Sequence, residues 1–183
     1  MNSTRLDPLR LKLRALLVGP PPKPWSLATT LAVGGLRAVG FDRHSELLLI
    51  VSSAGRGVID CTDGTRVARD DSEYYAGEES LEAAGIGPLQ GATIRMSGLF
   101  GGGLPTRTTD GWSVEVIVLD WPVSEVVLLE PKSFLYGSLY GKPTAFHKIG
   151  SDSEMRACGF SYSGRSLVIA TTSTISIFRR DGV

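Results

Sequence analysis

The chain has 183 residues, of which 42% are hydrophobic and 21% are charged. This length and composition are typical of one globular domain with a substantial core. Lysine and arginine together number 19, as do aspartate and glutamate, so the formal charge is zero. This balance argues against a nucleic-acid partner, since nucleic-acid binders normally carry an excess of positive charge.

The N-terminal part of the chain differs from the rest. Residues 7–17 predict a short amphipathic helix, which the proline-rich stretch 19–24 ends. The leucines expected to dock this helix on the domain are Leu9, Leu11, Leu13, Leu16 and Leu17. The apolar run is too short for a signal core, and no stretch approaches the roughly 18 apolar residues of a membrane span. We therefore expect a helix and linker over 1–24 and a single β-rich domain over 25–183, in a cytoplasmic protein that makes no membrane contact.

Short apolar runs separated by turn residues predict strands in the rest of the chain. Trp25 is expected to anchor the start of this folded unit. The predicted strands span 36–42, 46–52, 57–61, 65–69, 93–99, 112–120, 125–130, 145–149, 155–161, 165–171 and 174–179. The largely apolar run 46–52 predicts a strand covered on both faces. A brief helical turn is expected over 80–84, with Gly85 as its left-handed cap.

One short sequence occurs twice. The matching residues are Arg37-Ala38-x-Gly40-Phe41 and Arg156-Ala157-x-Gly159-Phe160. We expect each phenylalanine to lie in the core between sheets, and each glycine to permit close approach of another backbone segment. The two arginines are interpreted as structural. The repeat thus predicts two copies of one small β unit, one early in the chain and one at its end.

The second copy continues through 161–164 into the apolar run 167–169 and closes at 175–178. This segment, 155–182, resembles a blade of the WD-repeat family, in which a phenylalanine-serine pair, a turn and an apolar strand recur. The first copy, 36–64, resembles the same unit with a different turn, and neither copy carries the Trp-Asp dipeptide. The resemblance implies propeller-like antiparallel meanders.

The number of predicted strands limits how such meanders are arranged. About twelve strands make three blades, whereas closed propellers have roughly four to eight. We therefore expect an all-β fold of antiparallel meanders, either an incomplete propeller or a β-sandwich-like arrangement, with a short N-terminal helix.

Two segments outside the repeat are candidate ligand or partner surfaces. Their residues are Asp70, Asp71, Tyr74, Tyr75, Arg95, Gly101, Gly102, Gly103, Arg107, Asp110 and Trp112. The glycine-rich loop 98–112 exposes backbone amides, and with nearby arginines it suits an anion, although a flexible loop is the alternative. The acidic stretch 70–79 suits a basic protein partner or a divalent cation, although its spacing does not match a calcium loop and a solvated surface is the alternative.

The residues that usually carry catalysis are few. Cys61 and Cys158 are too few for a disulfide framework and are expected to be buried thiols. His44 and His147 are the only histidines, and no Gly-x-Ser-x-Gly motif is present. We therefore expect no catalytic residue, no cofactor and no metal.

The WD-repeat resemblance implies a non-enzymatic protein that binds another protein, as a scaffold or accessory subunit. Self-association as a homodimer through exposed β edges is left open. One alternative is a bacterial toxin-immunity or phage-defence component. Another is a small-ligand or anion-binding protein, or an enzyme, that uses the loop 98–112 with Arg95, Arg107 and Asp110.

Overall fold

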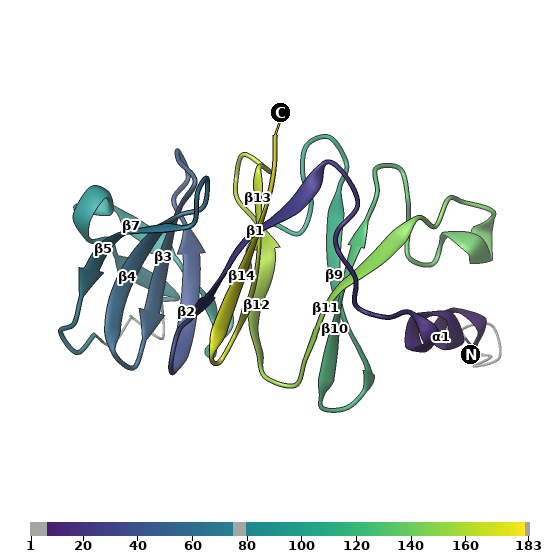
Figure 1. The fold of residues 1–183 in the computed structure, drawn as a ribbon, viewed down its shortest axis with the longest axis horizontal. Helices are drawn as coiled ribbons and strands as arrows, with labels where there is room; N and C mark the ends of the chain where they lie inside the picture. Colours follow the sequence, from purple (N-terminus) through teal and green to yellow (C-terminus); the bar gives the residue numbers. More distant parts are fainter. Residues whose placement is uncertain (1–6, 75–79, 182–183) are drawn as a thin grey trace.

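The structure is a computed structural model, which describes residues 7–74 and 80–181 (Figure 1). The elements of the first half are α1 (Asp7–Ala15), β1 (Trp25–Ala32), β2 (Leu36–Phe41), β3 (Leu47–Ser52), β4 (Gly55–Asp60), β5 (Thr65–Asp70), β6 (Glu82–Ala84), the 3-10 helix η2 (Gly87–Leu89), β7 (Thr93–Arg95) and β8 (Ser97–Gly98). Those of the second half are β9 (Ser113–Asp120), β10 (Val123–Leu129), the 3-10 helix η3 (Gly137–Tyr140), β11 (Phe146–Asp152), β12 (Met155–Phe160), β13 (Ser166–Thr171) and β14 (Thr174–Arg180).

Three antiparallel sheets stand side by side in Figure 1 and stack through their faces. Their strand orders are β5-β4-β3-β2-β8, β1-β14-β13-β12 and β11-β10-β9. The two-stranded sheet β6-β7 covers the outer face of the first sheet, and α1 covers the outer face of the third. The predicted fold class, antiparallel β meanders with a short N-terminal helix, is confirmed.

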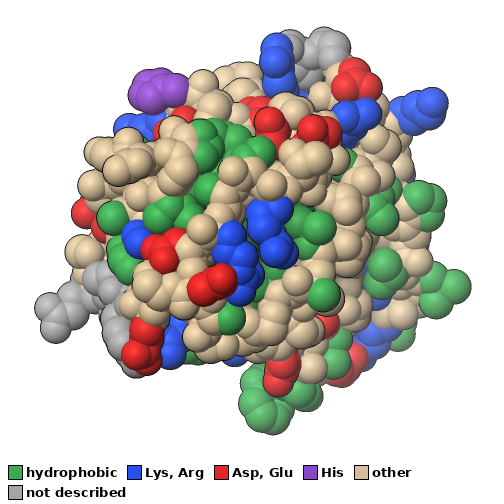
Figure 2. Space-filling model, turned by 60° about the vertical axis from the view of Figure 1, so that its left-hand side comes forward, with side chains coloured by type: hydrophobic (Ala, Val, Ile, Leu, Met, Phe, Trp, Pro, Cys, Tyr) green, Lys and Arg blue, Asp and Glu red, His purple; other side chains and the backbone are tan. Residues whose placement is uncertain are grey.

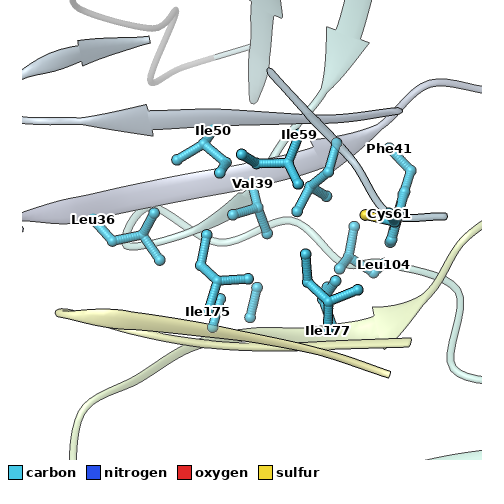
Figure 3. Packing of buried hydrophobic residues seen from close by; sticks show 13 residues of the cluster. Leu36, Val39, Phe41, Ile50, Ile59, Cys61, Leu104, Ile175 and Ile177 are labelled. Carbon is cyan, nitrogen blue, oxygen red and sulfur yellow. The ribbon is translucent and has the colours of Figure 1, made fainter. Parts of the chain in front are cut away.

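The central strand of each large sheet is buried on both faces. In β3, Leu48 and Ile50 face the sheet of β12–β14, whereas Leu49 and Val51 pack toward β6 and β7. Figure 3 shows the first of these cores, where side chains of β14 meet those of the β2–β4 meander. Each such side chain contributes about 1.5–3 kcal/mol through burial. The prediction that 46–52 is covered on both faces is therefore confirmed.

The repeated sequence forms the same local structure twice. The equivalent Cα pairs are Gly40 with Leu49 and Gly159 with Val168, then Phe41 with Leu48 and Phe160 with Leu167. The strand register shifts at Arg37 in one copy and at Arg156 in the other, so both arginines occupy a β-bulge. Arg156 also donates a hydrogen bond from Nε to the Leu36 oxygen (3.3 Å), which links the two sheets. The expected structural role of Arg156 is thereby observed.

The fourth strand of each unit comes from a different place. In the first unit it is β5, the next strand along the chain, and in the second it is β1 from the N-terminal side. The sequence prediction assigned no strand to Trp25–Ala32, because only one side of β1 is covered and its polar residues obscure the pattern. Trp25 does anchor this segment, since its side chain is buried against Phe160, with ring centres 5.4 Å apart.

A single segment, residues 94–108, lies along one edge of all three large sheets, and we call it the strap. Within it, β8 pairs with β2. Further along, the Phe160 amide of β12 donates to the Pro105 oxygen (2.7 Å). The Val114 amide of β9 then donates to the Thr106 oxygen (2.9 Å). The strap therefore bonds to the first, the second and then the third sheet, and so connects all three.

The repeat glycines make room for the strap. A Cβ at Gly40 would lie 2.2 Å from the Arg95 oxygen, and one at Gly159 would lie 2.4 Å from Cβ of Leu104. Such distances are far inside van der Waals contact, so a larger residue would displace the backbone of the strap. The predicted close approach at both glycines is confirmed.

Helix α1 docks on the domain as predicted, and it does so on the third sheet with fewer leucines than expected. Leu9 and Leu13 are buried beside Val127 and Leu129 of β10, with Leu16 partly buried. Leu11 and Leu17 are exposed, because the helix ends at Ala15 and a residue two positions from Leu9 points away from the sheet. Outside this contact, Arg14 donates two hydrogen bonds to Asp120 (2.6 and 3.0 Å), which fixes the helix to the β9–β10 hairpin.

Two local predictions are wrong. Residues 80–84 do not form a helical turn, since Glu82–Ala84 is strand β6 and pairs with β7. Gly85 is not in the left-handed region; a Cβ there would lie 2.1 Å from the Leu89 oxygen of η2, so close packing is what requires glycine. The single strand predicted over 93–99 is divided into β7, which pairs with β6, and β8, which pairs with β2.

We predict that Gly40→Ala lowers the free energy of unfolding by about 1–3 kcal/mol, because the new methyl group must displace the strap. Gly57→Ala is the matched control, since the nearest atom to its Cβ would be 3.7 Å away. Urea unfolding measures both. Equal stability of the two variants would contradict the close approach of the strap to β2.

Candidate functional site

The residues predicted around the glycine-rich loop do not meet at one site. Arg95 ends β7 beside the first sheet, and Arg107 pairs with Ser113 beside the third. The Gly101–Gly103 stretch lies on the exposed part of the strap, where Gly98 and Gly101 exchange backbone hydrogen bonds (2.9 and 3.0 Å). The loop is thus spread along the three sheets.

Asp110 and Trp112 are part of the structural framework. Asp110 accepts hydrogen bonds from both terminal nitrogens of Arg180 (2.5 and 2.8 Å) and from the Thr108 hydroxyl (2.6 Å). The Arg180 hydrogen bonds, against some burial, lower the pKa of Asp110 to about 2. Trp112 is buried, with its ring edge-on to Trp25 at 6.1 Å between centres. Together these contacts fasten the end of the strap to β14 and β1.

The acidic stretch is held in a similar way. Arg56 donates to Asp70 (2.5 Å) and to the Ala84 oxygen (2.8 Å), while its guanidinium carbon lies 3.9 Å from the ring centre of Tyr74. The Tyr74 hydroxyl in turn accepts a hydrogen bond from the Ala84 amide (2.8 Å). Asp70 therefore helps to join β6 to the first sheet.

Hydrogen bonds from Ser72, followed by that from Arg56, lower the pKa of Asp70 to about 2. The neighbouring Asp71 pairs with Arg69 on the surface. Tyr75 lies outside the described residues. Of the candidate residues described in this stretch, Asp70 and Tyr74 help to join elements, whereas Asp71 lies exposed on the surface.

The two cysteines have the burial expected of unreactive thiols. Cys61 is fully buried and Cys158 is half-buried, and neither forms a disulfide. Burial raises the pKa of both thiols, that of Cys158 to about 12. Little thiolate, the reactive form, is therefore present at neutral pH.

Strand β9 and its turn carry a group of exposed apolar residues, which sequence reasoning did not single out. Val116 and Val118 are 46% and 54% exposed, and Trp121 in the following turn is 87% exposed. Val114, on the same side of β9, is buried against the middle sheet. Val114, Val116 and Val118 therefore lie in one row on the same face of β9. The middle sheet covers Val114 and leaves Val116 and Val118 exposed.

The outer edge of β9 is also open along its backbone. β9 is the last strand of its sheet, and in the described part of the chain only the strap pairs with its outer side, at Ser113 and Val114. Because backbone groups alternate in direction along a strand, the amides of Val116 and Val118 point the same way as that of Val114. A register shift opposite Val123 and Ser124 ends the regular part of the strand. We call residues 115–118 the open edge of β9.

The two edges of the first sheet are charged or covered. β5 ends the first sheet and presents Arg66 and Arg69, which oppose the addition of another strand. Figure 2 shows basic and acidic side chains interspersed on the face that comes forward from this end of the molecule. The other edge of that sheet, at β2, is paired with β8 of the strap. Exposed valines and outward backbone groups without a neighbouring strand among the described residues make the open edge of β9 the candidate functional site.

The chain was compared with family models, with curated proteins and with solved structures, and none of the three comparisons gives a match. Over residues 7–74 and 80–181, no group of three histidine, cysteine, aspartate or glutamate residues is placed to hold a metal ion. Within the same residues, no helix has the length and apolar character needed to cross a membrane.

We predict that Asp110→Asn lowers the free energy of unfolding at pH 7 by about 1–2 kcal/mol, a value reduced because Asp110 is partly exposed. The folded pKa lies below the unfolded value of about 3.9, so the contribution is complete above pH 5 and disappears as the pH falls toward 2. The difference between the variant and the wild type should therefore shrink over that range.

Chemical denaturation at several pH values measures this difference. Asp71→Asn is the control, because its ion pair with Arg69 is exposed and contributes little. A deficit in Asp110→Asn that stays constant from pH 7 to pH 2 would show that the carboxylate does not act through its charge.

Proposed function

We propose that this chain is a cytoplasmic, non-enzymatic accessory protein that binds an extended segment of a partner protein along the open edge of β9. The observation that carries the proposal is the combination of unpaired backbone groups and two exposed valines on one strand. Edge strands present a ready template for another strand, and soluble proteins normally block them. An apolar edge that is left unblocked is therefore explained best by a partner.

The mode of binding follows from the position of the strap. Thr106 already occupies the position of a neighbouring strand beside Val114. The same position beside residues 115–118, which we call the lane, continues from there. A partner strand in this lane would gain main-chain hydrogen bonds from β9, and its alternate side chains would contact Val116 and Val118. The partner segment should therefore be extended and apolar at every second position.

The likeness of 36–64 and 155–182 to WD-repeat blades supports a role in protein binding. Members of that family mostly supply interaction surfaces, and the two meanders here share their strand register. Fold-level likeness is a weaker warrant than the site itself. The proposal therefore depends on β9.

We predict that Val118→Lys abolishes partner binding and leaves the fold intact, because a lysine side chain at the edge of a sheet opposes strand addition. Tagged wild type and variant are purified from native cells, and the proteins that accompany each are quantified. The matched control is Val67→Lys, which places the same charge at an exposed valine on β5.

The expected result is a partner recovered with the wild type and Val67→Lys and lost with Val118→Lys. If Val118→Lys and wild type recover the same proteins in equal amounts, the edge is not the binding site. The solution mass is measured in parallel, and a dimer that Val118→Lys dissociates would identify the partner as a second copy of this chain.

A further inference from the structure

A second surface feature lies beside β9, on the face opposite the exposed valines. A hollow of about 350 Å³ opens between the start of β9, the end of the strap and the loop that carries η3. In Figure 1 this loop lies at the end of the molecule next to α1. The volume falls within the range of pockets that bind small molecules.

The walls of the hollow are aromatic. Phe134 and Tyr136 are each about half exposed, and Tyr140 is 75% exposed, although all three line the hollow. Leu135 beneath them is buried in the core under α1 and helps to fix the loop to the sheet, while the three aromatic rings are exposed. Aromatic rings that line a hollow offer flat faces on which another flat molecule stacks.

The charges in the hollow favour an anion. Arg107 comes from the strap and Lys142 from the far end of the loop, so cations from two separate segments line the same space. Glu115 is the one acid in the lining. Burial raises the pKa of Glu115, against the opposite influence of Arg107. Within the described residues, Arg107 makes no side-chain hydrogen bond or ion pair, so its guanidinium is available to a ligand.

We propose that this hollow binds a small, flat aromatic molecule that carries one anionic group. The aromatic body stacks on the rings of Tyr136 and Tyr140, and the anionic group pairs with Arg107 and Lys142. Arginine suits this role because its planar donors match a carboxylate. The proposed partner strand would lie along the outer edge of β9 and contact Val116 and Val118, whereas the hollow lies on the face that carries Glu115, so the two proposals rest on different side chains.

The test uses the full chain and 2-naphthoate as the probe, with binding measured by calorimetry and by the NMR signals of the tyrosine rings. Naphthalene-2-carboxamide is the neutral comparator, and cyclohexanecarboxylate is the non-aromatic one. We expect 2-naphthoate to bind and shift the ring signals of Tyr136 and Tyr140, and both comparators to bind at least about tenfold more weakly.

Two substitutions should act in opposite directions. Arg107→Gln should weaken the binding of 2-naphthoate about tenfold, since it removes a charge-assisted contact. Glu115→Gln should strengthen it, because it removes the negative charge from the lining. Arg95→Gln is the matched control, since this exposed arginine lies on β7 and does not line the hollow.

Thermal unfolding checks that each variant is folded, and Lys142→Gln replaces Arg107→Gln if the latter is not. Opposite effects of the Arg107 and Glu115 variants on affinity would support the site. No binding of 2-naphthoate at roughly 1 mM would overturn the proposal. Equal affinity for the carboxamide, or an equal effect of Arg95→Gln and Arg107→Gln, would overturn it as well.

Discussion

The rest of the structure depends on the close approach of the strap to one edge of each large sheet. Gly40 and Gly159 permit it, because a Cβ at either position would collide with the strap. From there the strap pairs with β2, bonds to β12 and reaches β9. Three meanders that would otherwise expose three neighbouring edges are thereby joined. On this side of the described chain, residues 115–118 of β9 stay open, and the proposed function is placed there.

The distribution of apolar residues explains why function is expected at an edge or a loop. Both faces of each large sheet are used for packing, by another sheet, by β6 and β7 or by α1. Charged residues predicted as binding groups are largely occupied as well, as in the pairs of Asp110 with Arg180 and Asp70 with Arg56. Two surfaces that this packing leaves accessible are the open edge of β9 and the aromatic hollow on the opposite face of the same strand.

The sequence alone predicts the parts of this fold that depend on local patterns. Continuous apolar runs such as 46–52 indicate strands buried on both faces, and the repeated glycine and phenylalanine indicate two equivalent meanders. Local sequence patterns do not show which strands or side chains pair over long distances in the chain. The pairing of β1 with β14 and of Asp110 with Arg180 joins residues far apart in the chain. The alternating valines of β9 look the same whether a neighbouring sheet covers them or not, so the open edge could be recognised only in three dimensions.

Native-state amide hydrogen exchange at β9 tests most directly whether this edge is open. The Val114 amide, bonded to Thr106 of the strap, should exchange slowly. The amides of Val116 and Val118 should exchange fast in the isolated chain, because their outward groups meet only solvent. Slow exchange at all three positions in a chain shown to be monomeric would mean that another segment already fills the lane, and would contradict the account.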